Sequence, residues 1–294
     1  MSEDPYQPPY SGQYTPPQPP TYQGGSDIPP QSPYHYSPAP PRSSGSLLGW
    51  LGSAVLAVWA VVKYGLVFLV KIPAFATLFS ALISVGAYSL FYGPWFAVAL
   101  VVMIFVHEMG HVVEIQRQGM RATAPIFIPF LGAAIFQREH PTTAVKQAQI
   151  GIAGPIAGTI GATVAFVLFT ATQNPIFLLA ATIGFFLNLI NMLPVWQLDG
   201  AWVLAPVSPW FQVAGLAAIA VLAVVFHFVS ALLIIVALLG IQSARAAFRN
   251  ARNPYYTLVP ANARLALFAA WLALVLYLGV MTLQSESLFI SLAR

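Results

Sequence analysis

An uninterrupted run of apolar residues leads directly into the sequence HEMGH at residues 107–111. At 1.5 Å of rise per helical residue, residues 95–106 alone cover about 18 Å of a hydrocarbon layer that is roughly 30 Å thick. If this segment crosses a membrane as a helix, the polar cluster lies within the bilayer. Two imidazoles and a carboxylate are costly there, so by default they mark a functional site. The segment therefore predicts a membrane-spanning helix that carries a functional site.

The spacing within this cluster is typical of a zinc hydrolase. Residues four apart lie on one face of a helix, so His107 and His111 can direct imidazole nitrogens at one ion. Glu108 lies about a quarter turn away and is placed to take a proton from water rather than to bind the metal. A chance match on a solvated helix is the alternative explanation, and the apolar surroundings argue against it.

The composition excludes a soluble globular protein. Of the 294 residues, 58% are hydrophobic and 7% are charged, whereas soluble domains carry about 25% charged residues. The absence of cysteine excludes disulfides and thiolate metal ligands. The net charge of +4 is small, and the basic residues flank apolar segments as membrane-topology determinants do. We expect an all-α polytopic membrane protein in contact with the lipid bilayer, with no nucleic-acid partner.

Residues 1–46 are rich in Pro, Tyr, Gln, Ser and Gly and have almost no aliphatic side chains. Such a segment cannot build a core, so we expect a disordered, partly polyproline-II tail. Residues 19–22 form a PPxY sequence of the kind that WW domains bind. Such matches arise easily in a proline-rich tract. A flexible tether is therefore favoured over a specific tail-binding partner.

The remaining chain divides into apolar segments. Residues 47–71 contain Lys63 and form either an additional span or an interfacial helix. A membrane-embedded core that carries HEMGH is predicted over residues 72–250, followed by a linker and a C-terminal transmembrane helix at 251–294. We expect about six core transmembrane helices plus flanking helices. The clearest spans are predicted at residues 72–92, 95–116, 150–172, 175–193 and 265–283.

The stretch 119–149 is more polar, and its β-prone pieces are interrupted by proline and glycine. We expect a membrane-associated loop with one or two short strands, in which Glu139 and His140 are ordinary loop residues. Basic residues follow the HEMGH helix at 117, 121, 138 and 146. By the positive-inside rule, this end of the helix, and the active site with it, should face the cytoplasm.

Two further patterns concern helix packing. Glycines recur three and four residues apart in the range 151–161, which favours close packing against the HEMGH helix. Residues 209–240 are apolar except near His227 and form either one long helix or two short ones that meet there. A hairpin returns the arginines that follow to the cytoplasmic side, so we favour it, with His227 as a turn or interface residue.

Zinc requires another ligand at the depth of the two histidines. Most of the eight acidic residues lie in the tail, in a loop or beyond the last span. Glu114 shares the histidine face but lies roughly 10 Å of helical rise from His107, which favours an interfacial role. Asp199 remains. Pro194 should break the preceding span and Gly200 should allow a tight turn, so that the carboxylate can fold back to the metal.

Two asparagines lie in the same predicted span as the break. Buried amides need hydrogen-bonding partners. For Asn188 we expect a hydrogen bond between helices. Asn191 lies closer to the break and is a candidate to donate a hydrogen bond to a developing oxyanion.

Together, HEMGH in one span and N-x-x-P-x-x-x-L-D-G at residues 191–200 in another resemble the motifs of the site-2 proteases. These are intramembrane zinc metalloproteases of peptidase family M50. The resemblance covers about residues 72–240, so it implies that the core at 72–250 is an intramembrane metalloprotease. Members often carry a second glycine where this chain has Ala201. No stretch is long and polar enough for a PDZ or CBS domain, so the resemblance is to a compact form of the family.

The resemblance implies a role for each motif residue. His107, His111 and Asp199 would bind one Zn²⁺ ion, Glu108 would be the catalytic base, and Asn191 would assist at the substrate carbonyl. The implied substrate is a transmembrane protein, cleaved in or near its membrane span in regulated intramembrane proteolysis.

Two other functions fit the sequence less well. Intramembrane His and Asp also line ion pathways, but a metal transporter needs a chain of polar sites, often with internal repeats. Only one cluster and no repeat are visible in the sequence. A non-catalytic membrane scaffold would leave the complete motif set idle.

Overall fold

The computed structural model describes residues 49, 52–60, 63–64, 73–137, 139–225, 227 and 231–292. Contacts divide the chain into two units, residues 1–61 and 62–294. In the first unit, residues 52–60 are helical. The predicted tail with its PPxY sequence lies outside the described residues, as do parts of the range 47–71. The predicted domain boundaries therefore stay a prediction.

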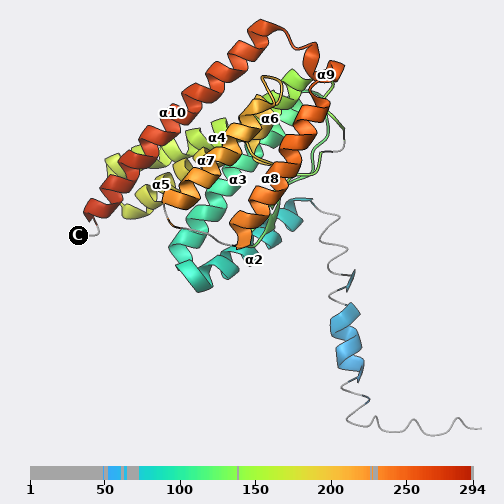
Figure 1. The fold of residues 1–294 in the computed structure, drawn as a ribbon. Helices are drawn as coiled ribbons and strands as arrows, with labels where there is room; N and C mark the ends of the chain where they lie inside the picture. Colours follow the sequence, from blue (N-terminus) through green and yellow to red (C-terminus); the bar gives the residue numbers. More distant parts are fainter. Residues whose placement is uncertain are drawn as a thin grey trace, which may run out of the picture. The chain divides into compact units, whose positions relative to one another are not determined.

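The second unit is built almost entirely of helices. In chain order its elements are α2 (Pro73–Tyr92), α3 (Pro94–Arg117), β1 (Ile126–Ile128), β2 (Gly132–Ala134), α4 (Ala144–Thr172), α5 (Pro175–Asn191), α6 (Asp199–Leu204), α7 (Trp210–Val225), α8 (Ala231–Asn250), α9 (Pro254–Thr257) and α10 (Ala261–Leu292) (Figure 1).

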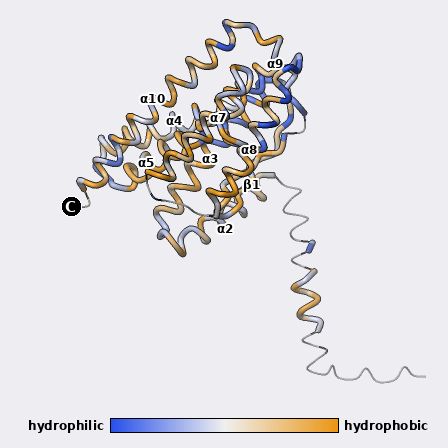
Figure 2. Tube along the Cα trace, viewed as in Figure 1, coloured by the Kyte–Doolittle hydropathy of each residue, from blue (hydrophilic) through white to orange (hydrophobic). Residues whose placement is uncertain are grey.

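Five helices of the described part are long and apolar enough to cross a membrane, namely α2, α3, α4, α8 and α10. Two shorter apolar helices, α5 and α7, accompany them. Apolar residues run along the helices, whereas hydrophilic residues gather around α9 and the neighbouring helix ends (Figure 2). The all-α polytopic membrane fold is therefore confirmed, with five long and two short apolar helices in place of about six spans.

Local sequence signals explain where the central helices begin. Gly93 has a φ of 83° and turns the chain, and Pro94 occupies the first turn of α3, where its missing N–H costs nothing. The Thr143 side chain accepts a hydrogen bond from the backbone N–H of Lys146 and caps α4. Because of this cap, α4 begins at Ala144, earlier than the hydropathy pattern predicted.

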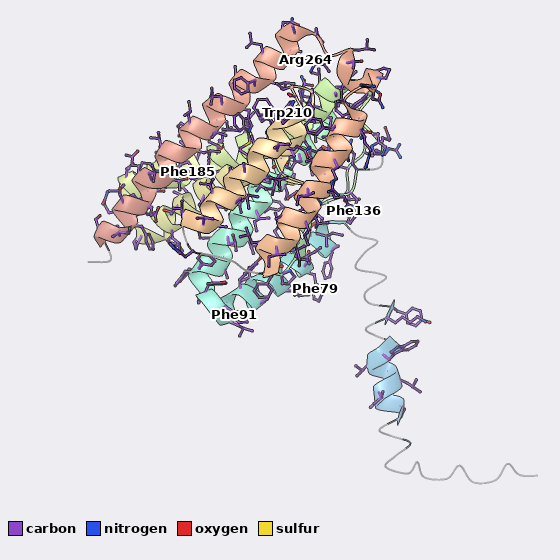
Figure 3. The ribbon with its side chains drawn as sticks, in the orientation of Figure 1. Phe79, Phe91, Phe136, Phe185, Trp210 and Arg264 are labelled. Carbon is purple, nitrogen blue, oxygen red and sulfur yellow. The ribbon has the colours of Figure 1, made fainter. Side chains whose placement is uncertain are left out.

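Small residues let α4 pack closely against α3. A Cβ atom at Gly110 of α3 would collide with the carbonyl of Ala153, and one at Gly161 of α4 would lie 2.9 Å from Val106. Helix α5, whose Phe185 is fully buried (Figure 3), contacts both α4 and α3. The predicted tight packing of the glycine-rich span beside the HEMGH helix is thus confirmed, and α3, α4 and α5 form the centre of the unit.

The predicted β-containing loop is an antiparallel hairpin of β1 and β2. Its backbone is fixed to α2 by three side-chain hydroxyls: Thr77 donates to the carbonyl of Pro125 (2.7 Å), Ser80 accepts from the N–H of Phe127 (3.1 Å), and Tyr88 accepts from the N–H of Phe130 (3.0 Å). Helix α2 therefore lies along β1, on the side of the hairpin away from β2.

The later helices close around the end of α5. Helices α7 and α8 form the predicted hairpin, with His227 at its turn in a left-handed conformation (φ 50°). The hydroxyl of Ser243 in α8 donates to Gln212 in α7 at 2.8 Å. Arg264, near the start of α10 (Figure 3), donates to three backbone carbonyls. Trp271 donates to the carbonyl of Met192 at 2.8 Å. The Arg264 bonds tie the start of α10 to α9 and to the segment after α6, and the Trp271 bond holds α10 against the chain break after α5.

Candidate metal centre

The broken backbone between α5 and α6 brings Asp199 to the histidines of α3. Helix α5 ends at Asn191, and Asp199 is the first residue of α6. A Cβ atom at Gly200 would collide with the carbonyl of Met192, so glycine lets α6 lie directly against the end of α5. The expected break at Pro194 is present, but the expected turn at Gly200 is wrong: Gly200 lies within α6, and the left-handed residue of the turn is Trp196 (φ 53°).

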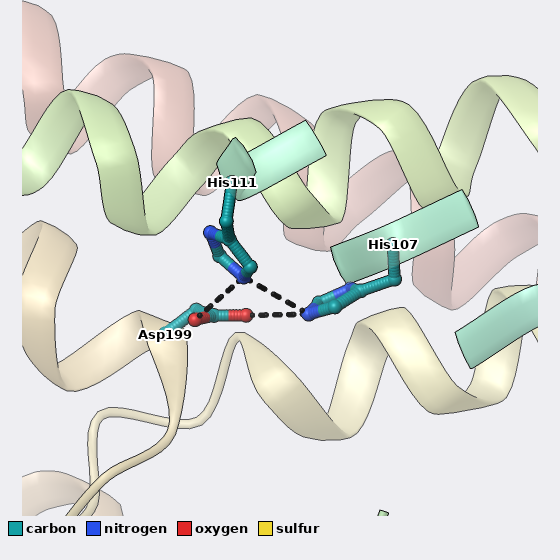
Figure 4. A group of neighbouring side chains, drawn as sticks. All are labelled: His107, His111 and Asp199. Atoms are coloured by element: carbon teal, nitrogen blue, oxygen red, sulfur yellow. Dashed lines mark hydrogen bonds and ion pairs between the residues drawn. The ribbon is translucent and has the colours of Figure 1, made fainter. Parts of the chain in front are cut away.

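Three side chains converge on one point (Figure 4). His107 Nε2 lies 3.1 Å from Asp199 Oδ2, and His111 Nε2 lies 3.3 Å from Asp199 Oδ1. The two Nε2 atoms are 3.2 Å apart. Among the described residues, this is the one group of three or more His, Cys, Asp or Glu side chains whose ligand atoms all lie within 4.8 Å of one another.

Hydrogen bonds behind the two rings determine which nitrogen faces this point. His111 Nδ1 lies 2.8 Å from the carbonyl oxygen of Ile150, which can only accept, so Nδ1 carries the proton. His107 Nδ1 lies 2.8 Å from Asn188 Oδ1. A neutral ring that donates from Nδ1 presents a lone pair at Nε2.

The donor set fits a zinc ion. Two imidazole lone pairs and a carboxylate point inward, and Asp199 Oδ2 is buried without a hydrogen bond from any described residue. Electron pairs brought this close together repel one another unless a cation lies between them. Catalytic zinc sites use such an arrangement, in which two His nitrogens and one carboxylate oxygen bind the ion and water takes the fourth position.

The cluster opens into a cleft of about 950 Å³, at the large end of the roughly 300–1,000 Å³ range of ligand pockets. Glu108 is half-buried and lines this cleft without belonging to the three-ligand group. Glu139 and His140 are exposed loop residues that lie on the cleft wall. The structure thus places the candidate base beside the candidate ligands, and their catalytic roles stay predictions.

Asn191 and Glu114 have different surroundings. Asn191 Nδ2 donates to the carbonyl of Leu187 at 3.1 Å, and the residue lines the cleft. The Glu114 carboxylate accepts two hydrogen bonds from Arg117, at 2.6 and 2.8 Å, and one from Gln118. Glu114 therefore pairs with residues at the end of α3 and does not belong to the three-ligand group, as its distance along the helix predicted.

Aromatic residues that are not among the predicted site residues also line the cleft. Trp196 and Trp202 each lie three residues from Asp199 in the sequence, and this proximity is a signal that could have assigned them to the cleft. Tyr255 and Tyr256 come from α9, and no local signal connects them with the motifs. Burial raises the pKa of the Tyr255 phenol to about 12, so it stays protonated and donates to the carbonyl of Pro141 at 3.2 Å.

The space for His111 depends on a glycine of α4. A Cβ atom at Gly154 would collide with the His111 imidazole. We predict that Gly154→Ala displaces this ring and weakens metal binding by about tenfold or more, measured by competition with a chelator. Gly279→Ala, in α10, is the matched control because a Cβ atom there meets nothing within 4 Å. Equal affinities of the two variants would contradict the packing argument.

The fold and the cluster define a polytopic membrane protein with a candidate His-His-Asp metal site. The family model of peptidase family M50 matches residues 95–175. This match supports membership of the site-2 protease family and indicates a membrane metallopeptidase. The matched range includes HEMGH and the glycine-rich helix but ends before Asp199, whose assignment depends on the geometry above. A search of curated proteins found no match.

Proposed function

We propose that this chain is an intramembrane zinc metalloendopeptidase that hydrolyses a peptide bond in or near a transmembrane segment of a membrane protein substrate. One observation carries the proposal: the ligand atoms of His107, His111 and Asp199 converge in a cleft that Glu108 also lines, within a bundle of membrane-crossing helices. The match to peptidase family M50 supports the reaction class.

The proposed mechanism assigns one role to each residue. His107, His111 and Asp199 would hold the zinc ion, whose Lewis acidity lowers the pKa of water and polarises a carbonyl group. Glu108 accepts the proton of the attacking water and then donates it to the leaving amine. Asn191 uses one Nδ2 proton for the Leu187 carbonyl and has a second with which to stabilise the developing oxyanion.

The hairpin gives the substrate a place to bind. A transmembrane helix protects its peptide bonds by its own hydrogen bonds, so it must unwind locally before hydrolysis. Ala133 and Ala134 of β2 line the cleft, and α2 lies on the β1 side of the hairpin. We propose that the unwound segment adds to the edge of β2 as an extended strand.

The proposed site lies toward the cytoplasmic side. Arg117, Arg121 and Lys146 surround the end of α3 nearest the cluster, and such residues favour the cytoplasm. Because the chain has no cysteine, a single cysteine introduced at position 121 gives an unambiguous label. We expect it to react with a membrane-impermeant maleimide only after the cytoplasmic face is exposed.

The direct test uses purified protein and a single-span substrate in liposomes. We expect cleavage that a zinc chelator stops and added zinc restores, with the cut located by mass spectrometry inside or next to the membrane span. Replacing helix-breaking residues of that span by leucine should slow cleavage, because unwinding becomes more costly. Chelator-resistant cleavage, or cuts confined to distant soluble loops, would overturn the proposal.

The same liposomes test the transporter alternative. Among the described residues there is one three-ligand group rather than a series of them, which favours chemistry at a single point over passage of an ion. Zinc flux that depends on His107, in the absence of proteolysis, would instead support a transporter.

A further inference from the structure

Asn188 is fully buried in α5, at 0% exposure, and bonds to one of the candidate metal ligands. Its Oδ1 atom lies 2.8 Å from His107 Nδ1, and its Nδ2 atom donates to the carbonyl of Gly184 at 2.7 Å. Since a carbonyl oxygen only accepts, the Gly184 contact determines the orientation of the amide. The oxygen of Asn188 must therefore face the histidine.

This orientation determines the tautomer of His107. An amide oxygen only accepts, so His107 Nδ1 carries the proton and Nε2 keeps its lone pair. That Nε2 atom is the one that faces Asp199 and His111. Without the amide, the neutral ring is free to place its proton on Nε2, a form that cannot bind a metal through that atom.

The packing around the amide is equally specific. A Cβ atom at Gly158 of α4 would collide with the Asn188 side chain, so α4 closes directly over the amide. His111 receives the equivalent hydrogen bond from the backbone carbonyl of Ile150. The His107 ring depends on a side chain, so a single substitution can remove its hydrogen bond, whereas the bond of His111 goes to the backbone.

We propose that Asn188 is a positioning residue that holds His107 in the tautomer and orientation needed to bind zinc. Asn188 does not line the cleft, so it acts through His107 rather than on the substrate, in contrast to Asn191. Partners of this kind typically contribute 10- to 100-fold to metal affinity. The inference rests on the proposed function, because it concerns the same metal site.

The test compares zinc affinity, by chelator competition, in variants of the purified full-length protein. Asn188→Leu, similar in size but without an acceptor, should bind zinc about 10- to 100-fold more weakly. Asn188→Asp should restore most of the affinity, because a carboxyl oxygen at this position can still accept from His107 Nδ1. Thr182→Val is the control, because it removes a hydrogen bond within α5, to Leu178, that is remote from the ligands.

A second measurement needs no variant at position 188. Selective ¹⁵N labelling of the five histidines reports the tautomer of each ring by NMR in zinc-free protein, with the His107 signal assigned from His107→Gln. We expect the proton of His107 on Nδ1. A proton on Nε2, or an unchanged zinc affinity in Asn188→Leu, would overturn the role of Asn188. If the wild-type protein binds no zinc, the proposed function itself fails.

Discussion

Glu108→Gln is expected to abolish peptide-bond cleavage while the protein still binds one zinc ion. Glutamine has nearly the size of glutamate, but its amide cannot accept a proton from water at neutral pH. Removing a general acid and base costs about 10²- to 10⁴-fold in rate, and in the proposed mechanism one carboxylate performs both transfers, so we expect a loss at the upper end of this range. The measurements are kcat on the single-span substrate and zinc content of the same sample.

A second glutamate on the same helix provides the control. Glu114 is paired with Arg117 and Gln118, so Glu114→Gln should leave the cleavage rate within a few-fold of wild type. Cleavage by Glu108→Gln at a comparable rate would show that Glu108 is not the base. Loss of zinc from Glu108→Gln would instead make it a ligand.

The parts of the site that the sequence predicted are those in which polar residues stand in apolar surroundings. HEMGH stands out because ionisable groups are costly inside a membrane span. A purely structural role does not explain why they are there, so a functional role is the better explanation. The chain has only eight acidic residues, and elimination by depth leaves Asp199 as the partner. The break at Pro194 follows from backbone chemistry alone, whereas the turn lies at Trp196 and not at Gly200, because Gly200 is needed for close approach to Met192.

The remaining features depend on contacts between distant parts of the chain. Nothing in the sequence near Asn188 indicates that its partner is His107, because that bond requires the packing of α5 against α3. The carbonyl of Ile150 has no sequence signal, since every residue has a carbonyl. The early start of α4 was missed because a polar first turn capped by Thr143 resembles a loop in a hydropathy pattern.

Asp199→Ala is expected to lower zinc affinity by more than about 100-fold, beyond the 10- to 100-fold typical of residues that only support a ligand. The substitution removes one of the three proposed ligands and the negative charge that would balance the ion, and it leaves two imidazoles to hold the metal. Zinc content after dialysis against a weak chelator measures the loss.

Thermal unfolding gives an independent measurement of the same site. A ligand that binds only the folded state at 100 times its Kd stabilises the protein by about 2.7 kcal/mol. Added zinc should therefore raise the Tm of the wild-type protein and of Glu139→Gln, which alters an exposed carboxylate elsewhere on the cleft wall. The Tm of Asp199→Ala should not respond. A normal zinc response in that variant would exclude Asp199 as a ligand, and the carboxylate would then have to act on water or substrate instead.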